Sequence, residues 1–154
     1  MLSNTVSADQ IGDLYWGSNG IEPRLSVGIP IIGCPDYLAL MQDRAKGSDL
    51  QFGPPILPDS LLKIIEKESP VSPSTTVKEP FLGKKILVLA GGKDELVPWV
   101  FSKSFVKGIK VGERGVKKVV VYPDVGHEFT PSMEEDVANF VWEEGCLLRQ
   151  TANL

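Results

Sequence analysis

The sequence feature that most constrains the fold is an unbroken apolar run, Lys85 to Ala90 (Lys-Ile-Leu-Val-Leu-Ala), which ends at two glycines, Gly91 and Gly92. A strand without polar alternation is typical of a parallel sheet that is covered on both faces. A second, β-branched run, Val116 to Tyr122, follows at a distance that leaves room for a helix over Pro98–Lys110. This strand–helix–strand order predicts parallel pairing with a right-handed crossover.

The flanking segments continue the alternation. The apolar run Leu25–Ile32 is predicted to be a further strand, and because Pro30 lacks an N–H group it indicates a strand end or a sheet edge. Thr130 and Pro131 have the residue types of an N-cap and a first helical residue. Helices are predicted over Asp36–Lys46, Leu61–Lys67 and Pro131–Gly145. The predicted fold class is therefore α/β, three layers with a small, mainly parallel sheet between helices.

The length of 154 residues suits a single domain spanning 1–154. Residues 1–24 form a polar N-terminal segment that is rich in glycine, serine and asparagine. Residues 69–80 contain three prolines and several hydroxyl residues, with little that can pack. They are predicted to be an exposed connection.

Composition argues against several classes of function. The net charge is −4 and no basic run is present, so no nucleic-acid partner is expected. No apolar stretch approaches the roughly 20 residues of a membrane helix, and the N-terminus lacks the pattern of a secretory signal. Cys34 and Cys146 are far apart and the chain has one histidine, so neither a disulfide framework nor a metal or cofactor site is expected. The expected location is cytoplasmic.

Two residues with acid–base chemistry follow consecutive strands. Asp94 lies four residues after Ala90, and His127 lies five residues after Tyr122. Because ligands of parallel α/β sheets bind at the carboxyl ends of the strands, both side chains are expected at one rim. A carboxylate there can hold one imidazole nitrogen and leave the other to move a proton. Taken singly, each residue has a simpler explanation, Asp94 as a helix cap and His127 as a solvated turn residue.

The segments around the two residues resemble a known family. Ala90-Gly-Gly-Lys-Asp-Glu-Leu-Val-Pro98 is similar to the segment that carries the triad acid of α/β-hydrolases, and Tyr122-Pro-Asp-Val-Gly-His-Glu-Phe129 is similar to their histidine segment. The resemblance covers Gly83–Gly145, and it includes the order of acid before histidine. It implies the C-terminal half of the α/β-hydrolase fold, with Asp94 and His127 as catalytic residues.

The nucleophile of that family stands in a Gly-x-Ser-x-Gly turn, which this sequence lacks. The nearest string is Trp16-Gly-Ser-Asn-Gly20, in which Ser18 is a weak candidate because no strand precedes it. Cys34 follows the first predicted strand, where a buried structural cysteine is the simpler interpretation.

The resemblance also implies that the family's earlier strands and oxyanion loop have no counterpart here, so the chain resembles a truncated hydrolase. The strand Leu25–Ile32 would then have an unpaired edge, and such edges invite pairing with another chain. We therefore expect a homodimer or a complementing polypeptide at this edge.

Three functions remain open. The first is ester or acyl hydrolysis of a small apolar or ester substrate, with a nucleophile supplied elsewhere. The second is a non-hydrolytic acid–base reaction, an isomerisation, elimination or cyclisation, and the third is a non-catalytic binding module. Aromatic residues that either line an apolar pocket or pack in the core are Trp16, Tyr37, Trp99 and Phe129, whereas Trp142 is expected in the core and Glu128 in solvent.

Overall fold

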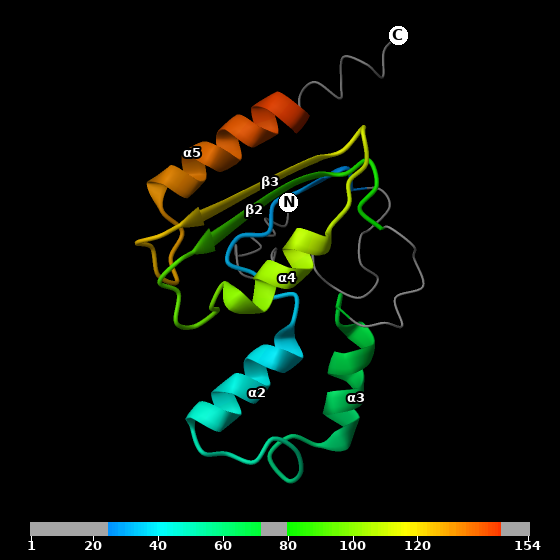
Figure 1. Ribbon diagram of the computed structural model, residues 1–154, viewed down its shortest axis with the longest axis vertical. Coiled ribbons are helices and arrows are strands. Elements are labelled where there is room, and N and C mark those ends of the chain that lie inside the picture. Colours follow the sequence, from blue (N-terminus) through cyan, green and yellow to red (C-terminus); the bar gives the residue numbers. More distant parts are fainter. Residues whose placement is uncertain (1–24, 72–79, 146–154) are drawn as a thin grey trace, which may run out of the picture.

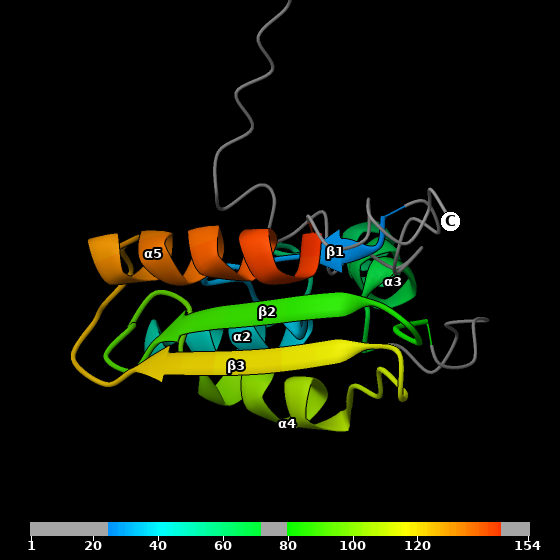
Figure 2. The same cartoon turned by 90° about the horizontal axis from the view of Figure 1, so that it is seen from above.

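A computed structural model describes residues 25–71 and 80–145 of the chain. Its three strands form one parallel sheet in the order β1-β2-β3 (Figure 1; β1 is labelled in Figure 2). The elements in chain order are β1 (Val27–Gly28), α2 (Tyr37–Gly47), α3 (Asp59–Glu68), β2 (Lys85–Gly91), α4 (Val100–Gly108), β3 (Val116–Tyr122), α5 (Pro131–Phe140) and the π-helical turn η1 (Val141–Gly145). The sequence-based expectation of an α/β fold with a small parallel sheet is confirmed.

The central strand β2 is buried on both faces, as its unbroken apolar run predicts. Because successive side chains of a strand point to opposite faces, Ile86 and Val88 pack on the α4 side, and Leu87 and Leu89 pack on the α5 side. Figure 2 shows the result, with α4 on one face of the sheet and α5 on the other. Helices α2 and α3 extend away from the sheet beside α4 (Figure 1).

The first strand is shorter than predicted. Within the predicted span Leu25–Ile32, only Val27–Gly28 is regular strand, and an isolated bridge joins Ile31 to Leu89. Pro30 accounts for the break, because its carbonyl accepts from Leu89 N at 3.0 Å but it has no N–H to return. Ile32 then takes a φ of 55°, a left-handed conformation that is unfavourable for a β-branched residue and turns the chain towards α2.

The predicted helices are present with different ends. Asp36, the first residue of the predicted helix Asp36–Lys46, is the N-cap of α2, since its Oδ1 accepts from Ala39 N at 3.0 Å. Thr130 caps α5 in the same way, accepting from Met133 N at 3.3 Å. The other predicted bounds require correction: α3 begins at Asp59, α4 spans Val100–Gly108, and the α-helix predicted over Pro131–Gly145 becomes π-helical after Phe140.

Two predictions of exposure were wrong. Trp142, expected in the core, is 76% exposed, because two helical steps from the buried Phe140 place it on the opposite side of the helix. Ser69, the first residue of the connection predicted to be exposed, is buried, and its hydroxyl donates to Pro35 O at 3.4 Å. Most of that connection, residues 72–79, lies outside the described residues, as does the N-terminal segment 1–24.

Within residues 25–71 and 80–145, no helix combines the length and the apolar character that a membrane crossing requires.

Candidate acid–base site

Asp94 lies in the turn between β2 and α4, at the carboxyl end of the sheet. Its Oδ1 accepts from the backbone N–H groups of Leu96, at 2.9 Å, and Val97, at 2.7 Å. A carboxylate that bonds the backbone two and three residues ahead stabilises such a turn and also fixes its own rotamer. The side chain is fully buried. With Oδ1 held by these two N–H groups, the position of the second oxygen, Oδ2, is fixed as well.

The imidazole of His127 lies against Asp94 Oδ2. Its Nδ1 lies 2.9 Å from Asp94 Oδ2, and the imidazole is 36% exposed. A carboxylate only accepts hydrogen bonds, so Nδ1 carries the proton and Nε2 bears a lone pair when the ring is neutral. Across the described part of the chain, Nε2 has no hydrogen-bond partner. The expectation that the two side chains meet at one rim is confirmed.

The glycine pair after β2 permits this meeting. A Cβ on Gly91 would lie 2.3 Å from Gly126 O, and one on Gly92 would lie 2.8 Å from Pro123 Cα. Backbone hydrogen bonds join the turn after β2 to the turn after β3, from Gly92 N to Tyr122 O at 2.7 Å and from Lys93 N to Val125 O at 2.9 Å. From the sequence, the glycines were interpreted only as the end of a strand. Their larger role is to let the Asp94 turn and the His127 turn lie against each other.

Contacts from distant segments hold the Asp94 turn and the helix that follows it. The Arg44 guanidinium on α2 donates to Leu96 O, 52 residues along the chain. The Ser102 hydroxyl on α4 donates to Gly33 O at 3.0 Å, which ties the start of α4 to the chain after β1. Nothing in the local sequence around Arg44 or Ser102 indicated these contacts, because they depend on how the layers pack.

A second polar pair lies at the base of the His127 turn. The Tyr122 hydroxyl at the end of β3 donates to Asp136 Oδ2 on α5 at 2.5 Å. Burial and then the bond to Asp136 raise the pKa of Tyr122 to about 12. The Tyr122 bond, aided by Lys118, whose ammonium lies 3.4 Å away, outweighs burial and lowers the pKa of the Asp136 carboxyl. Sequence reasoning missed this pair.

The surface around the site is mixed in character. Lys93 and Asp124 form an ion pair at 2.7 Å, but both side chains are largely exposed, so the pair contributes little to stability. Glu128 is exposed, as predicted.

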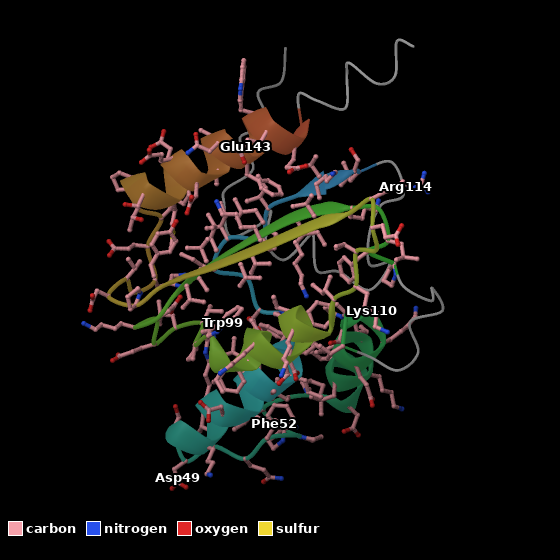
Figure 3. All side chains as sticks on the ribbon, turned by 45° about the horizontal axis from the view of Figure 1, so that its top comes forward. Asp49, Phe52, Trp99, Lys110, Arg114 and Glu143 are labelled. Atoms are coloured by element: carbon pink, nitrogen blue, oxygen red, sulfur yellow. The ribbon has the colours of Figure 1, made fainter. Side chains whose placement is uncertain are left out.

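Of the four aromatic pocket candidates, Tyr37 and Phe129 are exposed. Trp99, just before α4 (Figure 3), packs against the hydrophobic core on the α4 side of the sheet. Trp16 lies outside the described residues. Of the three candidates that the structure describes, two are therefore exposed rings and one is part of the core packing.

Among the described residues, no serine or cysteine side chain bonds to His127. Ser18 lies outside the described residues. Cys34 follows the Ile31 bridge and is buried, in line with the structural interpretation of this thiol. Among the described residues, no group of three or more His, Cys, Asp or Glu side chains could hold a metal ion.

Comparisons with protein-family models, with curated proteins and with solved structures find no match to this chain.

Proposed function

We propose that this chain is the acid–base portion of an α/β-hydrolase-like enzyme that cleaves small esters or related acyl substrates. The observation that carries the proposal is the 2.9 Å contact between His127 Nδ1 and a buried Asp94 whose other oxygen is occupied by backbone N–H groups. A solvated turn histidine has no need of such a partner. The resemblance of both segments to the acid and histidine segments of the family adds to this support.

The geometry is suited to two proton transfers. Nε2 takes the proton of an attacking hydroxyl as its oxygen bonds to the acyl carbon, and the imidazolium is stabilised by Asp94. Nε2 then returns that proton to the leaving alkoxide oxygen as the carbon–oxygen bond breaks. Water repeats the same two steps to release the acid and to regenerate the nucleophile. In this scheme Asp94 never gives up a proton, since its role is to orient the ring.

The nucleophile is the component that the described residues do not supply. Ser18 is the candidate within the chain, and a serine of a partner polypeptide or a bound water is the alternative. Fluorophosphonate labelling separates these sources, because the probe bonds covalently only to an activated serine. Labelling that disappears in Ser18→Ala but persists in the matched surface variant Ser60→Ala assigns Ser18.

Hydrolysis of p-nitrophenyl acetate by the full chain tests the function itself. We expect His127→Ala to lower the rate by about 10³-fold, within the usual contribution of a general base. Glu128→Gln is the matched control, since it changes the exposed neighbour of His127 and leaves the pair untouched. A wild-type chain that shows no turnover above the His127→Ala background would contradict ester hydrolysis by a nucleophile of this chain or by a bound water.

A second candidate function is an acid–base reaction without a nucleophile, such as an isomerisation, elimination or cyclisation. The observation that favours it is that Nε2 has no serine or cysteine partner in the described residues. Turnover that requires His127, in a protein that no fluorophosphonate labels, would select this function. If His127→Ala leaves every measurable function of the protein unchanged, both acid–base enzymes are excluded and the binding module remains.

A further inference from the structure

The turn that carries His127 is an eight-residue loop, 123–130, between β3 and α5. Its middle is held by the backbone bond from Lys93 N to Val125 O, at 2.9 Å. Its far end is held by the Thr130 cap of α5. His127 lies between these two anchors. Its position therefore depends on whether the two ends of the loop keep a constant separation.

Hydrogen bonds of the Tyr122 side chain join the two ends of the loop. The Tyr122 hydroxyl, on the last residue of β3, lies 2.5 Å from Asp136 Oδ2 and 3.3 Å from Ser132 O, both on α5. The Tyr122 ring packs against the core on the α5 side of the sheet, so the hydroxyl has a defined position. The carbonyl of the same residue accepts from Gly92 N at 2.7 Å. Tyr122 thus connects three segments: the helix after His127, the strand before it, and the turn that leads to Asp94.

We propose that Tyr122 is a positioning residue for His127, because its bond to Asp136 closes the base of loop 123–130 and keeps Nδ1 against Asp94. The inference rests on the proposed function for its catalytic meaning. Functional groups must be held within about 0.5 Å of the productive geometry. The bond from Tyr122 to Asp136 serves this demand because it fixes the distance between the strand before the loop and the helix after it. The raised pKa of Tyr122, to about 12, keeps the phenol protonated and able to donate at any physiological pH.

The test uses the fact that the chain has one histidine. In a ¹H–¹⁵N NMR spectrum of the full chain, freed of any histidine tag, the imidazole signals belong to His127 alone. The ¹⁵N shifts of the two ring nitrogens report which of them carries the proton. In the wild type we expect the Nδ1–H tautomer, which the bond to Asp94 selects. A free imidazole side chain prefers Nε2–H, so release of the ring is directly visible.

We expect Tyr122→Phe to lower the ratio of Nδ1–H to Nε2–H by about tenfold, the effect of losing one hydrogen bond to a charged group. Asp136→Ala, which removes the acceptor from the other side, should do the same. Asp136→Asn retains an acceptor oxygen and should restore most of the ratio. Lys118→Gln is the matched control, because it removes the other partner of Asp136 and leaves the bond to Tyr122 in place.

A purely structural role for Tyr122 would lower the melting temperature and leave the tautomer ratio of the folded protein unchanged. Wild-type ratios in both Tyr122→Phe and Asp136→Ala would overturn the proposal. If Tyr122→Phe does not fold, Asp136→Ala and Asp136→Asn decide the question alone, since that side chain is only partly buried. The readout needs no substrate, so absence of ester turnover would remove the proposed function without affecting this result.

Discussion

Replacing Gly91 by alanine tests whether close backbone approach is what brings Asp94 and His127 together. The added methyl group would lie 2.3 Å from Gly126 O and 2.6 Å from Val125 O. Both obstacles are backbone atoms of the His127 loop, so no rotamer change can relieve the contact. Normal packing requires about 3.2 Å or more between such atoms, and the loop must therefore move by about 1 Å.

A displacement of that size has two measurable costs. Overpacking of this kind destabilises a protein by about 1–3 kcal/mol, which for a chain of this length lowers the melting temperature by roughly 2–12 °C. The same movement exceeds the tolerance of the 2.9 Å bond between His127 Nδ1 and Asp94 Oδ2. We therefore expect Gly91→Ala to lose the preference of His127 for the Nδ1–H tautomer, in addition to the lower melting temperature.

The matched control is Gly108→Ala in α4, where a Cβ meets nothing within 4 Å. At this helical position alanine is favoured over glycine by about 0.5–1 kcal/mol, so the melting temperature should stay constant or rise. Thermal unfolding followed by far-UV circular dichroism, together with the His127 ¹⁵N shifts, measures both effects. If Gly91→Ala has the melting temperature of the wild type and retains the Nδ1–H tautomer, the reasoning from close approach is refuted.

Three further predictions follow from the same contacts. Asp94→Asn should reduce ester turnover by about 10³–10⁴-fold, because the amide can offer an N–H to Nδ1 and so select the wrong tautomer; the unchanged turnover of Lys93→Met under the same assay is the control. The Tyr122 hydroxyl stabilises the fold while it is protonated, and since its folded pKa is raised from 10 to about 12, this contribution is complete below pH 10 and is lost as the pH rises through 12. Absorbance at 295 nm should show one late-titrating tyrosine that is absent in Tyr122→Phe, and a tyrosine titration that is the same in both proteins would contradict the assignment. In the described residues β1 has no strand on its outer edge, so we expect light scattering to show a homodimer. Val27→Pro should weaken the dimer at least about tenfold, because it removes an N–H group from that edge. A wild-type monomer at micromolar concentration would contradict this expectation.

Much of the fold was accessible from local sequence patterns. The apolar run of β2 and the β-branched run of β3 predicted both strands to within one residue. Asp36 and Thr130 correctly marked the starts of two helices. These signals are local, because burial of a strand on both faces and capping of a helix depend on residues close together in the chain. The same reasoning failed for β1, where the one missing N–H of Pro30 outweighs an apolar run.

The sequence also predicted which two side chains share the rim, since the carboxyl ends of neighbouring parallel strands lie together. It did not reveal what holds them there. The approach of Gly91 to Gly126 O, the bond from Arg44 to Leu96 O and the bond from Tyr122 to Asp136 all join segments that neighbour each other only after folding. The exposure of Trp142 likewise depends on its angular position around a helix.

The division has a physical reason. The amino-acid sequence by itself determined the elements, their order and the chemistry of Asp94 and His127, because periodicity, capping and residue type act over a few residues. Only the tertiary structure decided the separation of the pair at 2.9 Å and the burial of Asp94. Both depend on how closely segments that are distant in the sequence pack against each other. Such contacts arise from packing density across the whole domain, which no short stretch of sequence encodes.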